Sequence, residues 1–306
     1  MPNLKNIIKE RNQLFENTRA FFKSRGVLEV DTALIRNHTV TDPYMSAYSV
    51  IDSNSKFQGY LQTSPEYAMK ILLSKSSGDI FQLSKMFRAE ESSPIHSSEF
   101  TMLEWYRIGF DHFDLIQETT DFIQTIVGKK KVQKLSYREI FISELAIDPF
   151  KITLKGLESF AKSELGEIPT DLLFDNYLTL LFSEKIEPAL DENVITVIHS
   201  YPESQASLAK TRKTNGIVTA DRFEIYLCGI ELANGFNELT DVKEQKLRFE
   251  KENQLRAHLN SEKIEIDVDF LNALESGIPD CSGVALGIDR LLMIKTGSTN
   301  ISDIIL

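Results

Sequence analysis

Two runs of strand-forming residues, 79–90 (DIFQLSKMFRAE) and 99–110 (EFTMLEWYRIGF), most constrain what this chain can fold into. Both are rich in aromatic and aliphatic residues that alternate with polar ones, a pattern typical of β-strands. The polar segment 91–98 (ESSPIHSS) separates them. We therefore expect two antiparallel strands joined by a long connection.

Side chains along the second strand alternate between the two faces of the sheet. One face carries Phe100, Met102, Glu104 and Tyr106, and the other carries Thr101, Leu103, Trp105 and Arg107. On the first strand, Arg88 and Glu90 also share a face. If these faces line one cleft, a guanidinium and carboxylates lie over an aromatic floor, where isolated charges are costly unless a ligand pairs them. This predicts a site for a ligand that is both anionic and cationic; salt bridges on a hydrated face are the alternative.

The rest of the chain alternates strand runs with helical blocks. Helical spacing occurs at 4–22, 64–73, 112–127, 153–185 and after about 288, and further strand patterns occur at 26–30, 45–51, 59–63, 193–201, 221–232 and 282–288. Ser64 and Pro65 suit the N-cap and first turn of the second helix. This order predicts an α+β fold with a mostly antiparallel sheet flanked by helices. Without repeats or a linker, 1–306 is expected to form one domain.

The net charge of −11 disfavours extended contact with nucleic acid, which requires clustered Lys and Arg. The short basic runs 128–134 (GKKKVQK) and 210–214 (KTRKT) are interpreted as solvated loops, with a local docking patch as the alternative. Cys228 and Cys281 are the only cysteines. With no disulfide framework, no signal peptide and no apolar run long enough for a bilayer, we expect a cytoplasmic protein without a membrane partner.

A second candidate site lies in 222–241 (RFEIYLCGIELANGFNELTD). Strand alternation ends at Glu231, and Glu238 follows past Asn234 and Gly235, which we interpret as a turn. Paired carboxylates suit Mg²⁺, which is usually bound by one or two of them together with substrate phosphates. Two acidic residues beside a turn also occur without a metal.

A third candidate lies where the Gly-rich strand 282–288 runs into an apolar helix, with Arg290 in its first turn. A helix N-terminus attracts anions, so an arginine there suits a phosphate; a surface arginine is the alternative. The chain has no GxxxxGK[ST], GxGxxG, GxSxG or HExxH motif. Phosphates would then be held by arginines and metal. His96 is the only histidine in a candidate site, which is weak evidence for a general base.

Four blocks together carry a family resemblance. FRAEESSPIHSSEFTMLEWY (87–106) resembles motif 2 of class II aminoacyl-tRNA synthetases, and SGVALGIDRLLMI (282–294) resembles motif 3. ELANGFNELTD (231–241) and TSPEYAMK (63–70) are similar to the lysyl branch. The resemblance extends over nearly the whole chain and implies a class II catalytic core that uses ATP and Mg²⁺.

Two features narrow the resemblance to the shortened paralogues of lysyl-tRNA synthetase, which attach (R)-β-lysine to a lysine of translation elongation factor P. PESQASLAK (202–210) is similar to a segment of those ligases, and Ala285 stands where lysyl synthetases typically have glycine. The first core helix begins at about Leu4, so no N-terminal anticodon-binding OB-fold domain and no contact with a tRNA anticodon are expected.

The resemblance implies roles for individual residues. Arg88 and Arg290 would be catalytic: Arg88 holds the α-phosphate, and Arg290 sandwiches the adenine with Phe100 and reaches the γ-phosphate. The implied ATP-binding residues are Arg88, Ala89, Glu90, Ser97, Phe100, Glu231, Leu232, Gly287 and Arg290. The implied amino-acid pocket comprises Ser64, Pro65, Glu66, Glu104, Tyr106, Asn234, Glu238 and Ala285. Glu231 and Glu238 would carry Mg²⁺.

The chain departs from the family pattern at two places. HSSEF stands where His-Asn-Pro-Glu-Phe is usual, so an adenine contact passes to Ser97, and Ala33 replaces the usual proline of motif 1. The second departure concerns the interface of the homodimer that the resemblance implies. The expected reaction is adenylation of β-lysine and transfer to a lysine ε-amine. The alternatives are a free-standing enzyme acting on tRNA or a small acceptor, and a catalytically silent regulatory paralogue.

Overall fold

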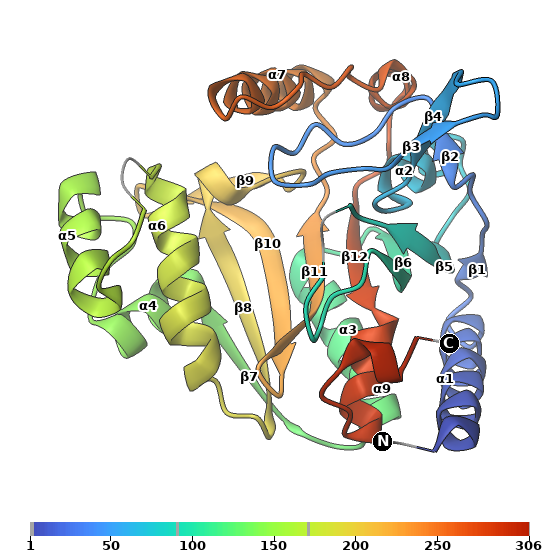
Figure 1. The fold of residues 1–306 in the computed structure, drawn as a ribbon, viewed down its shortest axis with the longest axis horizontal. Helices are drawn as coiled ribbons and strands as arrows, with labels where there is room; N and C mark the ends of the chain where they lie inside the picture. The colour runs from blue at the N-terminus through green and yellow to red at the C-terminus, as the bar shows by residue number, and fades with distance from the viewer. Residues whose placement is uncertain (1–2, 90–91, 170–171, 306) are drawn as a thin grey trace. The chain divides into compact units, whose positions relative to one another are not determined.

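The computed structural model describes residues 3–89, 92–169 and 172–305 (Figure 1). The chain divides into two compact units, one made of Met1–Gly128 and Glu238–Leu306 and the other of Lys129–Asn237. The second unit is therefore an insertion between the two segments of the first. That residues 1–306 act as one domain stays a prediction.

The first unit contains the predicted strand pair. Its sheet has the order β1 (Leu28–Glu29), β5 (Ile80–Phe87), β6 (Glu99–Ile108), β12 (Cys281–Gly287). The pair β5 and β6 is antiparallel, with Ile80 opposite Tyr106 and Phe87 opposite Glu99, which confirms the expected pairing. β12 is antiparallel to β6, and β1 is parallel to β5.

Helices α1 (Leu4–Lys23), α3 (His112–Val127) and α9 (Ile288–Thr296) lie on one side of this sheet (Figure 1). The Phe22 ring of α1 stacks on Phe81 at 4.6 Å between centroids and meets Trp105 of β6 edge-on at 5.2 Å. Phe122 of α3 packs against the same tryptophan. Since Trp105 faces this apolar layer, the alternate residues of β6 face the opposite side, as the alternation predicts.

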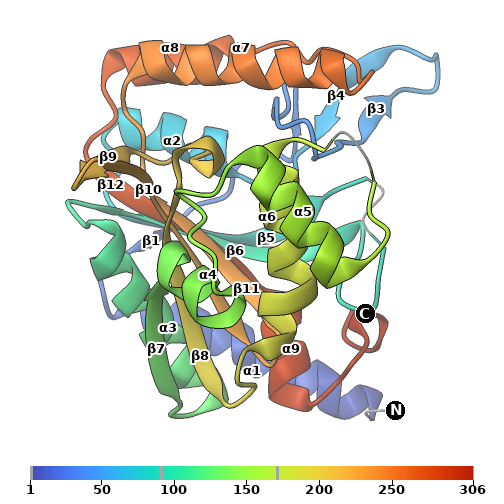
Figure 2. The same ribbon diagram turned by 90° about the vertical axis from the view of Figure 1, so that its left-hand side faces the viewer.

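The opposite side carries α2 (Glu66–Ser74), α7 (Val242–His258) and α8 (Val268–Ser276), which lie close together in Figures 1 and 2. The Tyr67 ring of α2 stacks on Phe270 of α8 with centroids 4.5 Å apart. A small antiparallel sheet of β2 (Ile35–Arg36), β4 (Phe57–Leu61) and β3 (Ser49–Ile51) and a short 3₁₀ turn at Ile301–Asp303 complete the unit.

The predicted N-cap of α2, Ser64, is wrong by one residue. Pro65 occupies the N-cap with φ −82° and ψ 2°, and the helix begins at Glu66. Ser64 instead accepts a hydrogen bond from the Glu66 backbone N–H at 3.3 Å, just before the helix. Its hydroxyl still organises the first turn, although it is not the helix cap.

In the second unit the strands follow the order β11 (Ile230–Asn237), β10 (Ile217–Leu227), β8 (Val194–Pro202), β7 (Lys131–Ser136), and β9 (Thr211–Thr214) pairs with β10. β7 is parallel to β8, and the other pairs are antiparallel. Helices α4 (Tyr137–Leu145), α5 (Leu154–Leu165) and α6 (Phe174–Leu181) pack beside these strands (Figure 2). A π turn (Phe182–Ile186) and two 3₁₀ turns (Glu187–Ala189, Glu203–Gln205) follow.

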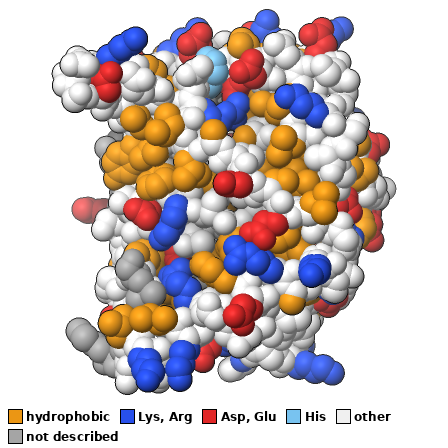
Figure 3. All heavy atoms as spheres, turned by 90° about the vertical axis from the view of Figure 1, so that its right-hand side faces the viewer, with side chains coloured by type: hydrophobic (Ala, Val, Ile, Leu, Met, Phe, Trp, Pro, Cys, Tyr) orange, Lys and Arg blue, Asp and Glu red, His pale blue; other side chains and the backbone are white. Residues whose placement is uncertain are grey.

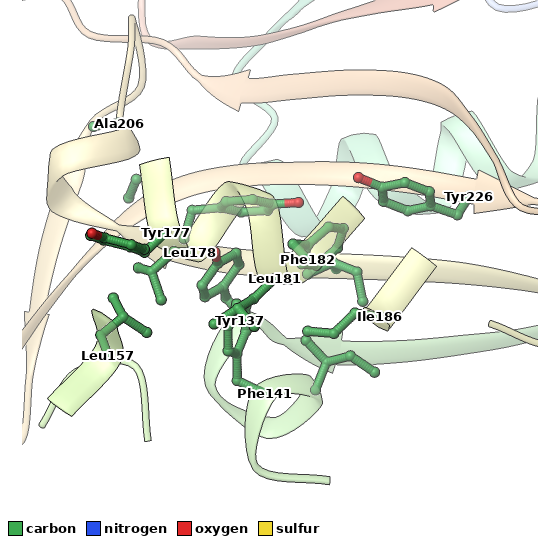
Figure 4. Close-up of a cluster of buried hydrophobic side chains, with 14 of the residues drawn as sticks. Tyr137, Phe141, Leu157, Tyr177, Leu178, Leu181, Phe182, Ile186, Ala206 and Tyr226 are labelled. Atoms are coloured by element: carbon green, nitrogen blue, oxygen red, sulfur yellow. The ribbon is translucent and has the colours of Figure 1, made fainter. Parts of the chain in front are cut away.

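An aromatic cluster fills the space between these helices and the sheet (Figure 4). The Tyr137 ring stacks on Phe141 with centroids 4.6 Å apart and lies parallel to Phe182 at 5.8 Å. Leu157 of α5 and Tyr226 of β10 join the same buried group. This cluster gives the second unit a hydrophobic core of its own.

Several expectations for the second unit are wrong. The helical block 153–185 is broken after α5 at Gly166, whose φ of +79° suits glycine. The strand pattern 221–232 contains a tight hairpin at Cys228 and Gly229, both with positive φ, so β10 and β11 are separate strands. The basic runs that we interpreted as loops lie largely on the strands β7 and β9.

Strand pairing within each unit is mostly antiparallel and helices pack against the strands, so the predicted α+β class is confirmed. Cys228 and Cys281 are free thiols. Across the described ranges, no helix combines the length and the apolar character needed to cross a bilayer.

Candidate active site

The paired strands β6 and β12 form the floor of the candidate site in the first unit. Glu104 and Tyr106 are 3% and 2% exposed, and the Tyr106 hydroxyl donates to Oε1 of Glu104 at 2.6 Å. Gly283 lies opposite Tyr106, and Ala285 lies opposite Glu104. A Cβ at Gly283 would lie 2.3 Å from Cε1 of Tyr106 and 2.5 Å from Oε1 of Glu238. Only glycine at position 283 therefore leaves room for both the Tyr106 ring and the Glu238 carboxylate.

A buried ionic cluster adjoins this floor. The Lys70 ammonium of α2 lies 2.6 Å from Oε1 of Glu66, one helical turn earlier, and 2.6 Å from Oε2 of Glu238. Lys70 and Glu238 are each 1% exposed. The structure thus brings together Glu66, Glu104, Glu238 and Tyr106, all predicted for the amino-acid pocket, around a lysine that was not predicted.

The charges in this pocket influence one another strongly. Burial and the nearby charge of Glu66 raise the pKa of Glu104 to about 8, although the hydrogen bond from Tyr106 opposes the shift. Burial and Glu104 raise the pKa of the Tyr106 hydroxyl. Burial would lower the pKa of Lys70, but Glu238 and Glu66 outweigh it and raise that pKa above its ordinary value. The pocket therefore combines ionised groups with a carboxyl that readily gains or loses a proton near neutral pH.

Arg88 follows β5 directly and lies half-buried beside the far end of β6. Its guanidinium carbon is 5.2 Å from the centroid of the Phe100 ring, and Nε donates to the Thr63 carbonyl at 3.4 Å. Ala89 forms a bridge to Ser46 through its backbone N–H. The predicted guanidinium over an aromatic ring is present, at the opposite end of β6 from Tyr106.

Arg290 lies in the first turn of α9, as predicted, with Gly287 at the N-cap. Its Nε donates to the Ile95 carbonyl at 3.3 Å, and Nη2 lies 2.5 Å from Nε2 of His96. The Ser93 hydroxyl is 2.8 Å from Nδ1 of the same histidine. Arg290 therefore contacts the polar loop between β5 and β6, which joins the motif 2 and motif 3 segments.

Asp289, next to Arg290, anchors this helix. Its Oδ1 accepts from Nη2 of Arg11 on α1 at 2.6 Å, and Oδ2 accepts from the Thr101 backbone N–H at 2.6 Å. Asp289 is 1% exposed. Because Thr101 follows Phe100, this carboxylate fixes α9 against the strand that carries the aromatic ring.

The remaining predicted residues are placed as follows. Strand β11 of the second unit carries Glu231, Leu232 and Asn234. Asn234 and Gly235 pair with β10, so the turn predicted at these two residues is wrong. Ser97 is half-buried in the polar loop, and Pro65 is buried at the start of α2. Glu90 lies outside the described residues. In the described ranges no group of three or more His, Cys, Asp or Glu side chains is placed to hold a metal.

A family model for class II tRNA synthetases (D, K and N) matches residues 1–306. The chain belongs to this class II synthetase family. The match includes all four blocks on which the sequence resemblance depends.

Curated relatives refine this assignment. The chain is 44% identical to a protein of Proteus mirabilis (strain HI4320) over 98% of this chain and 94% of that protein. It is 42% identical to a protein of Vibrio vulnificus (strain YJ016) over 97% of this chain and 94% of that protein. It is also 42% identical to a protein of Haemophilus ducreyi (strain 35000HP / ATCC 700724) over 96% of this chain and 91% of that protein. All three are named elongation factor P–(R)-β-lysine ligase. The predicted resemblance to the shortened lysyl paralogues is confirmed.

Sequence reasoning missed two residues of the site, Lys70 and Gly283. The spacing of Glu66 and Lys70, four positions apart on a helix, was an available signal, but it usually marks an exposed ion pair. Gly283 precedes Ala285 on the same face of β12, where a missing side chain allows close approach. Asp289 was also missed, because its role depends on partners from α1 and β6.

Proposed function

We propose that this chain is an ATP-dependent ligase that activates (R)-β-lysine as an acyl-adenylate and transfers it to the ε-amine of a lysine of elongation factor P. The observation that carries the proposal is the buried cluster of Glu66, Glu104 and Glu238 beside Tyr106. Acidic side chains in a buried pocket suit cationic partners, and a diamino acid supplies two ammonium groups. The relatives' names supply the β-lysine and the acceptor.

The nucleotide is assigned to the other end of β6. Arg88 and Phe100 form a guanidinium–ring pair there, and Arg290 reaches the same polar loop through Ile95 and His96. We assign the α-phosphate to Arg88 and the adenine and γ-phosphate to Phe100 and Arg290. With these assignments the amino acid and the nucleotide would meet along β6, as attack of the substrate carboxylate on the α-phosphorus requires.

The chain's own residues act by positioning and charge stabilisation. The β-lysine carboxylate attacks the α-phosphorus and pyrophosphate leaves, and then the acceptor amine attacks the acyl carbon and AMP leaves. Arg88 and Arg290 stabilise the negative charge that develops on the phosphates. The resemblance alone assigns the side chain of Asn234, in the second unit, to the substrate carboxylate, to which its amide N–H groups can donate. No covalent enzyme intermediate is needed.

Magnesium is part of the proposal as a counter-ion of the triphosphate. A metal bound to Glu238 would lie near the Lys70 ammonium, which repels it. We therefore keep Glu238 for amine recognition, and Glu231 of the second unit keeps the role of Mg²⁺ ligand that the resemblance alone implies.

A homodimer is proposed from the exposed apolar side chains of the first unit. Figure 3 shows hydrophobic side chains gathered on the face where β1 to β4 lie. Leu28, Ile35, Ile51 and Phe57 are 60%, 47%, 60% and 50% exposed. Large exposed apolar patches are typical of interfaces. Sedimentation of the purified protein at micromolar concentration should give twice the chain mass, and a single-chain mass would contradict the dimer.

The free thiols of Cys228 and Cys281 suit a cytoplasmic location, where disulfides are rare, and we propose that location for the protein.

Label transfer tests the function. The protein is incubated with ATP and labelled β-lysine or α-lysine, while elongation factor P and bulk tRNA are offered in parallel. Label from β-lysine on elongation factor P is the expected result. Label on tRNA alone, or on neither acceptor, contradicts the proposal. Elongation factor P with its acceptor lysine replaced by arginine is the control.

A further inference from the structure

The amino-acid pocket contains a cation of its own. We propose that Lys70 is a positioning residue that orients Glu66 and Glu238 and supplies the positive charge that this buried carboxylate pair needs in order to accept a diamino acid. This inference rests on the proposed function and names the residue that sets the charge of the same site.

The geometry gives Lys70 two carboxylate partners at once. Its Nζ is 2.6 Å from one oxygen of Glu66 and 2.6 Å from one oxygen of Glu238, and these residues come from α2 and from the segment before α7. An ammonium has three N–H donors on a flexible stem, so it can hold two acids at a set separation. Both carboxylates are thereby oriented before any ligand binds.

The surroundings of Lys70 exclude water. Its ammonium lies 5.8 Å from the centroid of the Phe270 ring, and Tyr67 stacks on that ring from the same helix as Lys70. Lys70 itself is 1% exposed. In such a place solvent does not screen charges, so the balance of charges among the side chains and the ligand has to be nearly complete.

The contacts of Lys70 explain why a lysine is needed. Its ammonium is the cation that touches both Glu66 and Glu238. Without Lys70 these two buried carboxylates would repel each other and lose the orientation in which they meet the amines of a ligand.

A purely structural role would look different. A buried ion pair stabilises a fold weakly, and well-packed apolar residues of similar size often replace one without loss. If Lys70 only filled space, Lys70→Met would keep the affinity for the amino acid. If it balances charge, the same variant loses that affinity while ATP binding, at the other end of β6, is unaffected.

The test measures ATP–pyrophosphate exchange in the full chain. Lys70→Met should raise the KM for β-lysine by about 100-fold or more and leave the KM for ATP within about twofold. Lys75→Met is the matched control, because Lys75 caps the same helix and is exposed. Its KM values should equal those of the wild type.

A double variant separates charge balance from folding. Lys70→Met with Glu66→Gln removes one charge of each sign, so it should lower the KM for β-lysine by about tenfold or more relative to Lys70→Met alone. If the single variant does not fold, the double variant is compared with Glu66→Gln alone, and its KM for β-lysine should be about tenfold or more higher, because Glu238 loses the cation that orients it.

The inference is overturned if Lys70→Met keeps the wild-type KM for β-lysine, if it raises the KM for ATP equally, or if the double variant binds β-lysine no better than the single one. A folded double variant whose KM for β-lysine is no higher than that of Glu66→Gln alone also overturns the inference. A wild-type protein that activates no diamino acid contradicts the proposed function instead.

Discussion

Ala285 and Glu104 face each other across the antiparallel pair of β12 and β6. Directly opposed residues in such a pair have neighbouring Cβ atoms on the same face of the sheet. The methyl group of Ala285 therefore lies beside a carboxyl that we assign to a substrate amine. A change of a single methyl group at this position alters the space in which that amine is placed.

Ala285→Gly is expected to move the preference from β-lysine toward α-lysine. The two substrates differ in the position of one amine by one carbon, and a contrast of this size is worth about 1–3 kcal/mol. The ratio of kcat/KM for the two amino acids in ATP–pyrophosphate exchange measures the effect. An unchanged ratio would remove Ala285 from the specificity residues.

Arg88→Ala is expected to slow adenylate formation by about 100-fold or more, because a preorganised charge at the α-phosphate is lost. Exchange of labelled pyrophosphate into ATP at saturating β-lysine is the measurement. Arg19→Ala, an exposed arginine on α1, is the control and should be unaffected. Near-normal exchange by Arg88→Ala would contradict the assignment of the α-phosphate to this residue.

Arg11→Met is expected to destabilise the fold by about 3–5 kcal/mol, since it leaves the buried Asp289 carboxylate without its ion pair. Arg19→Met on the same helix removes an exposed pair with Glu29 and should cost less than about 1 kcal/mol. Urea unfolding of the two variants gives both values. Equal losses would show that Arg11 does not anchor α9 through Asp289.

Glu252 is expected to make stability depend on pH. Burial raises its pKa from 4.5 to about 7; the Thr41 hydroxyl and Arg248 oppose the shift, and Asp42 and Glu66 add to it. The folded state thus keeps a proton that the unfolded chain releases, so this group's contribution falls as pH rises from about 4.5 to about 7. The full effect is at most about 3 kcal/mol.

Comparison of Glu252→Gln with the wild type isolates that effect. The variant should lose less stability than the wild type between about pH 5 and pH 7, as measured by urea midpoints. Glu250→Gln, an exposed neighbour on α7, should follow the wild type. If Glu252→Gln shows the wild-type slope, the carboxyl is already ionised throughout this range.

The faces of β6 could be predicted from the sequence because one of them packs against aromatic residues. Trp105 faces Phe22 and Phe122, so alternation alone places Glu104 and Tyr106 on the other side. The first turn of α9 could also be predicted, because an apolar helical pattern follows a Gly-rich strand. In both cases a local pattern coincides with tertiary packing.

The lysine in the pocket could not be predicted from local pattern. A lysine at this position of a helix is expected to be solvated. The burial of Lys70 depends on its contact with Glu238, which is distant in the sequence. The hairpin between β10 and β11 was missed because Cys228 takes the left-handed conformation, with a φ of 55°, that glycine or asparagine usually supplies. β7 was missed because its exposed lysines resemble those of a solvated loop. Its strand conformation depends on pairing with β8, which is distant in the sequence.

The most direct test of the central claim is amino-acid-dependent ATP–pyrophosphate exchange by the purified chain. β-Lysine, α-lysine and 6-aminohexanoate, which has only one amine, are compared at matched concentrations. We expect β-lysine to give the highest kcat/KM and 6-aminohexanoate to give no exchange above background, because a single amine leaves the buried carboxylates unbalanced. Exchange with 6-aminohexanoate equal to that with β-lysine, or no exchange with either diamino acid, would contradict the account.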